Sequence, residues 1–236
     1  MLVLHGFTGS PVSVRPWAQA LADDGLTVRL PLLPGHGTRW QDLNDTRWTD
    51  WFATAEAAYE DLAARCDQVF ICGLSMGGTL ALRLAGLRHD VAGVVVVNPS
   101  LSTADRRAFL LPVVSRFVAS FPGVGDDISR PGVTEDAYGR LPLRAAASLQ
   151  QLWRETRSVL GAITAPVLAF RSAVDRIVPP SSLRLLQAGA NATTVTERVL
   201  DRSFHVATLD TDAPQIFAET LAFIHANAPA GAGDAR

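Results

Sequence analysis

The hydrophobic positions of this chain fall into short apolar runs separated by amphipathic stretches. Short Val-, Ile- and Leu-rich runs are typical of strands buried in a parallel sheet, and apolar residues spaced three or four apart are typical of the helices that cover it. The clearest run, VAGVVVV at Val91 to Val97, predicts a central strand buried on both faces. The alternation therefore predicts an α/β fold, with a mostly parallel central sheet and helices on both faces.

The individual elements follow from the same pattern and from its Gly and Pro breaks. Strands are predicted over residues 1–4, 26–30, 68–72, 91–97, 165–171 and 195–200. Helices are predicted over residues 16–24, 49–65, 76–87, 144–160 and 212–227. No internal repeat is visible, and the tail 229–236 is predicted to be disordered.

One long segment, residues 101–160, interrupts the alternation, because no strand is predicted within it. It contains the apolar stretch 109–121, which fits either a buried helix or a transient contact with a membrane surface. An insertion of this length between strands is commonly a cap or lid. We expect a cap at 101–160 on a core formed by residues 1–100 and 161–228. Two ordinary sheet-covering helices joined by a long loop are the alternative.

Composition narrows the function classes. The chain has 236 residues and a net charge of −2, so it carries no electrostatic footprint for nucleic acid. All 21 basic residues are Arg, which excludes chemistry that needs a lysine Schiff base or a P-loop lysine. Cys66 and Cys72 are too few for a disulfide framework and lack metal-ligand spacing. With no leader and no membrane-spanning run, a cytoplasmic location is expected.

The most informative stretch is QVFICGLSMGGTLALRLA, in which a strand-like run ends at Gly73 and a helix follows Ser75. A G-x-S-x-G motif alone is weak, but a strand-turn-helix around it places the serine on a tight turn with its Oγ above the sheet edge. Gly73 and Gly77 would let the strand and helix approach closely. The alternative is a Gly-rich helix start with a capping serine.

A serine hydroxyl needs an oriented base, and in this architecture the acid and then the histidine follow in loops after later strands. The strand PVLAF leads to Asp175, and the strand VTERVL leads to His205. The predicted set is therefore Ser75, Asp175 and His205. Asp201 and Asp210 flank the histidine and are rival acids, but Asp175 is preferred because it has its own strand and loop.

Two backbone N–H groups are candidate donors to an oxyanion. One belongs to Met76, directly after the serine, and the other to Phe7, in the loop after the first strand. A simple β-turn at His5-Gly6 is the alternative reading of that loop. Of the other histidines, His5 and His36 are expected to brace Gly-rich turns, and the surface is expected to carry His89 and His225.

Together these stretches resemble the α/β-hydrolase superfamily, and in particular the bacterial monoacylglycerol lipases and small carboxylesterases. The resemblance spans nearly the whole chain, and the segments that carry it are HGFTGSP (5–11), LPGHGT (33–38), GLSMGGT (73–79), VDRIVPP (174–180) and SFHVATLD (203–210). It implies an α/β-hydrolase fold with Ser75 as nucleophile, Asp175 as acid and His205 as base. It also implies that Phe7 and Met76 form the oxyanion hole.

The cap segment PGVTEDAYGRLP (131–142) resembles the part of the family's cap that lies at the glycerol side. The resemblance implies that Glu135 or a neighbour helps to hold the polar head of the substrate. Gly139 departs from relatives that carry a larger polar residue there, which bears on fine substrate preference.

The implied activity is hydrolysis of monoacylglycerol to fatty acid and glycerol through a serine ester, with no metal or cofactor. A short-chain carboxylesterase is the nearest alternative, and a hydrolase-fold protein that binds a ligand without turnover is a second. The expected partner is a small lipid ester, and the chain is expected to be a monomer or a homodimer. Only four residues precede His5, so the resemblance also predicts about 20 further residues upstream, forming an edge hairpin.

Overall fold

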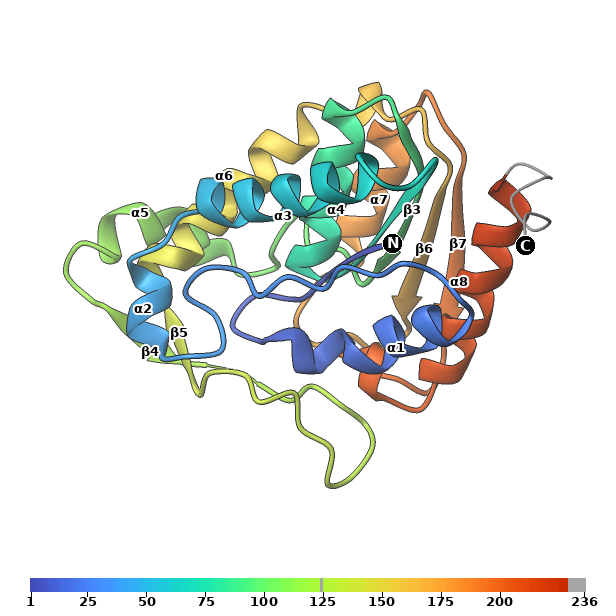
Figure 1. Cartoon of the computed structure of the whole chain (residues 1–236). Helices are drawn as coiled ribbons and strands as arrows, with labels where there is room; N and C mark the ends of the chain where they lie inside the picture. Colours follow the sequence, from blue (N-terminus) through green and yellow to red (C-terminus); the bar gives the residue numbers. More distant parts are fainter. Residues whose placement is uncertain (124, 229–236) are drawn as a thin grey trace.

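The computed structural model describes residues 1–123 and 125–228. Within them, five parallel strands form one sheet in the order β1-β2-β3-β6-β7 (Figure 1). The strands are β1 (Leu2–Leu4), β2 (Val69–Leu74), β3 (Val91–Val97), β6 (Val167–Ser172) and β7 (Val195–Leu200). Their order places β2 and β3 in the interior of the sheet, where both strands are almost wholly buried.

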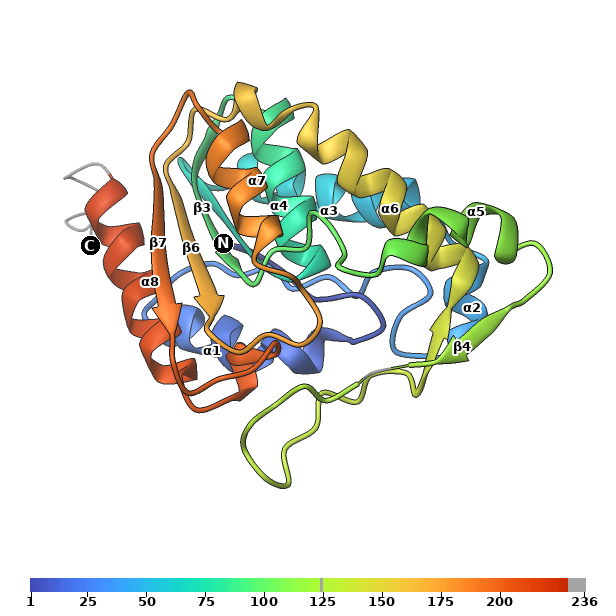
Figure 2. The same cartoon turned by 180° about the vertical axis from the view of Figure 1, so that it is seen from behind.

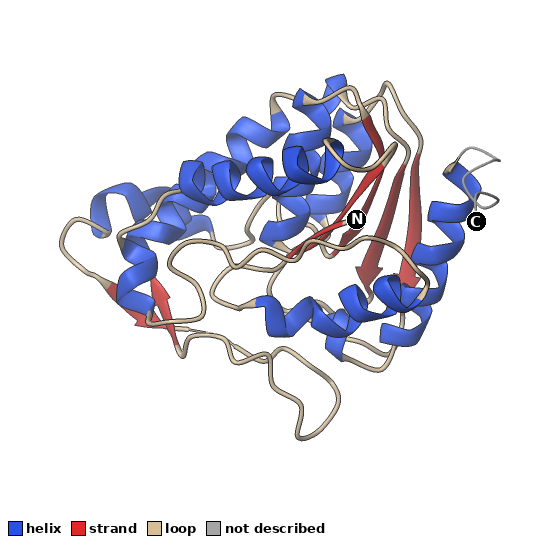
Figure 3. Cartoon of the chain, viewed as in Figure 1, coloured by secondary structure: helices blue, strands red, loops and turns tan. Residues whose placement is uncertain are grey.

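Helices cover both faces of this sheet (Figures 1 and 3). On one face lie α3 (Trp48–Ala63), α4 (Met76–Leu87), α6 (Leu143–Arg157) and α7 (Ser181–Gly189). On the other lie α1 (Arg15–Asp23) and α8 (Ala213–Asn227). The predicted α/β architecture with helices on both faces is therefore confirmed.

Two separate hydrophobic cores result from the alternation of side chains along the strands. In β3, Val94 and Val96 pack toward α3, α4 and α6, whereas Val95 and Val97 pack toward α1 and α8. All four are fully buried. A continuous apolar run is what such a strand requires, because neither face meets water.

One predicted strand is wrong. Residues 26–30 form only an isolated bridge, in which Arg29 accepts a hydrogen bond from Val3 N and donates one to Met1 O, both at 2.8 Å. Pro31 has no N–H, so the ladder cannot continue beyond this point. The segment instead packs Leu26, Val28 and Leu30 against the core.

The segment 101–160 also departs from prediction, because it contains two strands. β4 (Ser120–Pro122) and β5 (Arg140–Pro142) form a short antiparallel ribbon. Each strand has three residues and pairs only through a partner distant in sequence, so neither leaves a local pattern. The remaining helices, α2 (Trp40–Asn44) and α5 (Leu111–Val114), are also short, whereas α6 confirms the helix predicted over 144–160.

The apolar stretch 109–121 is not a buried helix. Phe109 is 76% exposed and Phe117 is 82% exposed, and only four residues of the stretch form an α-helix. Among the described residues, no helix is long and apolar enough to cross a membrane. The tail predicted to be disordered, 229–236, lies outside the described residues.

Candidate active site

Ser75 occupies the turn between β2 and α4. Its backbone adopts φ +54° and ψ −114°, a conformation that residues other than glycine rarely adopt. The turn is tied to the strand ends by hydrogen bonds: Ser75 N donates to Val97 O at 2.9 Å, and Ser100 N donates to Ser75 O at 3.2 Å. Ser75 thus lies beyond the carboxyl end of β2, as its G-x-S-x-G context predicts.

The glycines on either side of Ser75 make this turn possible. A Cβ at Gly77 would lie 2.1 Å from Leu4 O, and a Cβ at Gly73 would lie 2.3 Å from the Gly77 backbone. Neither distance is compatible with a side chain. Only glycine therefore permits α4 to begin so close to the ends of β1 and β2.

Asp175 and His205 form a buried pair. His205 Nδ1 lies 2.9 Å from Asp175 Oδ2, and the two side chains are 8% and 6% exposed. Asp175 Oδ1 accepts hydrogen bonds from the backbone N–H groups of Ile177 at 2.9 Å and Val178 at 2.8 Å. These bonds hold the carboxylate in one orientation, so its second oxygen faces the imidazole.

The surroundings of His205 favour its protonated form. Burial lowers the pKa of the imidazole, but its hydrogen bond to Asp175 and the charges of Asp175, Glu135 and Asp127 outweigh it, so the net shift of the pKa is upward. A base arranged in this way accepts a proton readily and holds the resulting cation beside Asp175.

The two rival acids lie elsewhere. Asp201 is exposed. Asp210 is fully buried, and its carboxylate accepts hydrogen bonds from the backbone of Ser129, Phe204 and Thr211. Asp210 therefore closes the loop that carries His205, while the side-chain contact with the imidazole comes from Asp175.

Two bracing residues of the histidine loop were not anticipated from the sequence. Asn98 follows β3, with φ +46°, and its Nδ2 donates to His205 O at 2.8 Å and to Ser172 Oγ at 3.0 Å. Ser172 Oγ in turn donates to Phe204 O at 2.7 Å. The Asn-Pro pair directly after the VVVV run is the sequence feature that could have indicated a special turn at Asn98, since Asn tolerates positive φ.

The loop after β1 lies against the serine turn. A Cβ at Gly6 would be 3.5 Å from Ser75 Cβ, and both Phe7 and Ser75 line one cavity. His5 fixes this loop, because its Nε2 accepts from Leu33 N at 3.1 Å and its Nδ1 lies 3.0 Å from Gly6 O. Met76 is fully buried at the start of α4.

The remaining four histidines have the positions predicted from the sequence. Burial lowers the pKa of His5 to about 4 and that of His36 to about 3, so both are neutral at physiological pH. His36 lies beside His5 with their ring centroids 4.9 Å apart. His89 and His225 are exposed at the surface.

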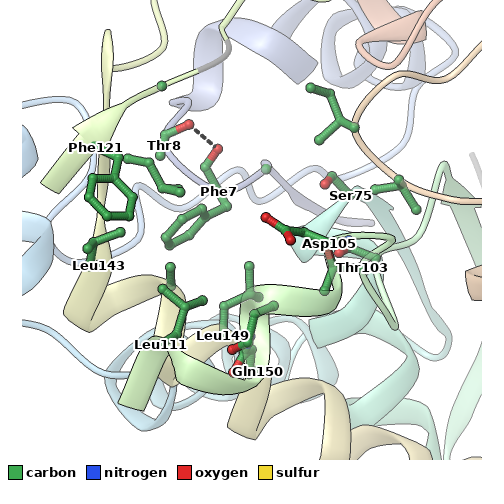
Figure 4. A pocket seen from close by; sticks show the side chains of 18 of the residues that line it. Phe7, Thr8, Ser75, Thr103, Asp105, Leu111, Phe121, Leu143, Leu149 and Gln150 are labelled. Carbon is green, nitrogen blue, oxygen red and sulfur yellow. Dashed lines mark hydrogen bonds between the residues drawn. The ribbon is translucent and has the colours of Figure 1, made fainter. Parts of the chain in front are cut away.

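A cavity of about 590 Å³ opens onto Ser75 and His205. Its apolar wall comes largely from the segment 101–160, through α5, the ribbon and α6. Figure 4 shows Phe7, Leu111, Phe121, Leu143 and Leu149 gathered to one side of Ser75. The volume is typical of sites for small organic ligands, and the lining suits an alkyl chain.

Glu135 lines the same cavity. It is 9% exposed, and burial, reinforced by the neighbouring Asp126 charge, raises its pKa to about 6. Tyr138, three residues on, donates from its hydroxyl to Gly35 O at 2.8 Å, and its backbone N–H donates to Thr8 O at 3.1 Å. The loop between β4 and β5 is therefore attached to the β1 loop beside the cavity.

The class of protein follows from this arrangement and from comparison with known families. The model of the alpha/beta hydrolase family matches residues 1–226, and the chain belongs to this family. The fold, the serine turn and the order of the three polar residues along the chain all accord with that membership.

Particular relatives are lipases and esterases. The chain is 40% identical over 228 residues to a thermostable monoacylglycerol lipase of Bacillus sp. (strain H-257), covering 94% of this chain and 89% of the relative. It is 25% identical over 227 residues to a carboxylesterase of Bacillus subtilis (strain 168), covering 95% of this chain and 91% of that relative. One solved structure, from a study of the metagenome-derived lipolytic enzymes LipS and LipT, is 37% identical, with a TM-score of 0.91 over 95% of this chain and 92% of that one.

Proposed function

We propose that this protein is a serine hydrolase of lipid carboxylic esters, and that it cleaves monoacylglycerol to fatty acid and glycerol. The observation that carries the proposal is the buried His205–Asp175 pair, whose imidazole lines the same largely apolar cavity as Ser75. The identity to a monoacylglycerol lipase over nearly the whole chain supports the same substrate class.

In the proposed mechanism, Ser75 Oγ attacks the ester carbonyl carbon while His205 takes the hydroxyl proton. Asp175 holds the imidazole tautomer and stabilises the imidazolium. The backbone N–H groups of Phe7 and Met76 bind the oxyanion. His205 then gives its proton to the leaving alcohol, and a water molecule activated by His205 releases the fatty acid.

The two sides of the cavity receive the two halves of the ester. The apolar side chains of α5 and α6 contact the acyl chain, where each buried CH₂ contributes about 0.8 kcal/mol. Glu135 lies on the polar side and hydrogen-bonds the hydroxyl groups of the glycerol. Gly139, four residues further along the chain, is exposed, and nothing lies within 4 Å of a Cβ placed there.

A short-chain carboxylesterase remains the second candidate, favoured by the similarity to the Bacillus subtilis carboxylesterase. Initial rates on monoacylglycerols and on simple ethyl esters of matched acyl lengths separate the two. We expect kcat/KM to rise with acyl length into the medium- and long-chain range. A steep fall beyond short acyl chains would reject the lipase assignment.

Covalent labelling tests the enzyme claim itself. A fluorophosphonate probe should label the wild-type protein and fail to label Ser75→Ala. Ser100→Ala is a matched control, since Ser100 also lines the cavity and should leave labelling intact. A folded wild-type protein that resists the probe would instead favour a hydrolase-fold protein that binds its ligand without turnover.

We propose further that the cap touches the surface of a lipid aggregate. Six large apolar side chains are exposed on the described part of this segment, and two of them, Leu110 and Phe121, also line the cavity. The set is Phe109, Leu110, Val113, Phe117, Val118 and Phe121. Because the patch adjoins the cavity, docking it on a lipid surface would let a monoacylglycerol enter without crossing water.

Sedimentation with vesicles measures this contact. Phe109→Ser with Phe117→Ser should weaken binding to phosphatidylcholine vesicles, while kcat/KM on a soluble short-chain ester stays at the wild-type value. The matched control is Leu87→Ser, an exposed leucine at the end of α4 outside the cap. Equal vesicle binding by the double variant and the wild type would refute the contact.

A further inference from the structure

One carboxylate in the loop between β4 and β5 touches both loops that carry the catalytic pair. Asp127 Oδ2 accepts a hydrogen bond from His205 N at 3.2 Å and another from Arg176 N at 3.3 Å. Arg176 directly follows Asp175 in the chain. A single side-chain oxygen therefore bridges the backbone of the histidine to the backbone beside its acid.

Further contacts close a ring around this bridge. Asp127 O accepts from Val206 N at 3.1 Å, and Asp127 Oδ1 lies 3.3 Å from Arg176 Nη1. The Arg176 guanidinium lies 3.9 Å from the centroid of the Phe204 ring. Both neighbours of His205 in the chain are thus held, one by Asp127 and the other by the arginine that Asp127 binds.

Figure 2, seen from behind, shows the loop between β4 and β5 below the level of the carboxyl ends of β6 and β7, from which the acid loop and the histidine loop continue. The next residues of the loop continue the contact: Ser129 Oγ donates to Arg202 O, and Ser129 N donates to Asp210 Oδ2. The cap segment is therefore bound to the histidine loop along several consecutive residues.

Stability alone explains the buried Asp127 poorly. Its side chain is 4% exposed, whereas its ionic partner Arg176 is 60% exposed. A pair in which one partner is largely solvated gains little from its charges, and burying the carboxylate is costly. The carboxylate does, however, fix the positions of the backbone N–H groups of His205 and Arg176, from which it accepts hydrogen bonds.

We propose that Asp127 is a positioning residue, which holds the histidine loop and the acid loop in register so that His205 meets both Asp175 and Ser75. This inference rests on the proposed function, because it assigns Asp127 a part in the same site. Asp127 acts through the backbone of His205 and Arg176, so it is not itself a catalytic residue.

The neighbouring carboxylate gives the proposal a second consequence. Asp126 Oδ1 accepts from Glu135 N at 2.7 Å and from Thr134 Oγ1 at 2.8 Å. Asp126 therefore holds Glu135, on the polar side of the cavity, and the adjacent Asp127 holds the two loops of the catalytic pair. A displacement of this loop changes both at once.

Asp127 also acts on His205 through its charge. The charged groups that face the imidazole are Asp175, Glu135 and Asp127, and each negative charge stabilises the imidazolium. Removing one of them should lower the pKa of His205. Since the base must be neutral to act, the acid limb of the pH profile of kcat reports this pKa.

The decisive variant is Asp127→Asn, which keeps the shape and one accepting oxygen but removes the charge and turns an NH₂ group toward the Arg176 side. We expect kcat to fall about 10-fold, with KM changed less than about twofold. The acid limb should move to lower pH by about half a unit. Loss of packing alone would lower the activity without moving the limb.

A matched control is Asp212→Asn. Asp212 is also buried, and its carboxylate accepts hydrogen bonds from one backbone N–H and one guanidinium, both of Arg202, where Asp127 accepts from two backbone N–H groups and one guanidinium. Asp212 has no such bond to His205 or Arg176 among the described contacts. Asp212→Asn should lower the thermal midpoint by a similar amount and leave kcat and the acid limb at their wild-type values.

If Asp127→Asn fails to fold, Arg176→Gln is a second variant for the same test. The Arg176 side chain is mostly exposed, so we expect this variant to fold. It leaves the Asp127 charge unpaired, so the acid limb should move the other way, to higher pH, with a kcat loss of about threefold. The proposal is overturned when the folded variants keep both kcat and the acid limb of the wild type.

A separate readout distinguishes failure of this inference from failure of the proposed function. The His205 Nδ1 proton shared with Asp175 should give a low-field proton NMR resonance in the wild-type protein. That resonance should shift or broaden in Asp127→Asn and stay in place in Asp212→Asn. Wild-type protein that hydrolyses no ester rejects the proposed function, whereas an unmoved resonance in Asp127→Asn rejects the positioning role.

Discussion

The sheet and the segment 101–160 differ in what their apolar residues do. In β3, Val94 to Val97 are fully buried between two helical layers. In the segment 101–160, Phe109 and Phe117 are mostly exposed although they are larger and equally apolar. The same kind of side chain therefore stabilises the fold in one region and faces outward in the other.

The sheet and the segment 101–160 also differ in what they contribute to the candidate active site. The sheet supplies the rigid turns that carry Ser75, Asp175 and His205, while the segment 101–160 supplies most of the apolar wall of the cavity and Glu135. Reactive groups need fixed geometry, and this is best given by the carboxyl ends of buried strands.

The largest expected effect lies on the sheet side, at Asp175, the proposed acid. Asp175→Asn keeps the shape but cannot hold the catalytic tautomer of His205, so kcat should fall by about 10⁴-fold. Steady-state hydrolysis of a soluble ester measures the loss. Asp201→Asn, in the exposed rival acid, should retain full activity, and the reverse ranking would reassign the acid.

A matched pair of aromatic residues tests the comparison of cores. Phe170, in β6, is fully buried, and Phe170→Ala should lower the free energy of unfolding by about 3–5 kcal/mol. Phe117→Ala, in the segment 101–160, should change it by less than about 0.5 kcal/mol. Urea denaturation followed by tryptophan fluorescence gives both values. A large loss in Phe117→Ala would mean that its side chain is packed in solution.

A pair of glycines sharpens the same contrast. Gly77→Ala places a methyl group against Leu4 O, and we expect a cost of about 3 kcal/mol with a loss of activity, since the serine turn must shift. Gly139→Ala meets open space and should be neutral or stabilise the protein by about 0.5 kcal/mol. Thermal unfolding compares the two, and tolerance of Gly77→Ala would argue against the tight turn.

The smallest predicted effect concerns Glu135. Burial raises its pKa to about 6 from 4.5, so the folded protein binds the proton more tightly than the unfolded chain, and stability falls as the pH rises between these values. Glu135→Gln should remove this dependence. The free energy of unfolding of the variant, relative to that of the wild type, should therefore rise by up to about 2 kcal/mol from pH 4 to pH 7. Denaturation across this pH range measures the difference, and parallel curves would contradict the shift.

The local sequence determined most of the sheet and its helices. The runs 91–97 and 195–200 and the helix 76–87 have the bounds predicted for them, because a short β-branched run or a helix that follows a glycine-rich turn leaves a local signature. The G-x-S-x-G turn and the candidates Asp175 and His205 were found for the same reason, since each follows a recognisable strand.

Other features were decided only by tertiary structure. The ribbon of β4 and β5, the bridge at Arg29 and the exposure of Phe109 depend on partners distant in the chain, and no short window contains those partners. The contact of Asp127 with His205 spans 78 residues. The sequence by itself placed the reactive groups at strand ends; only the packed molecule decided which carboxylates surround them, because burial and charge act through space.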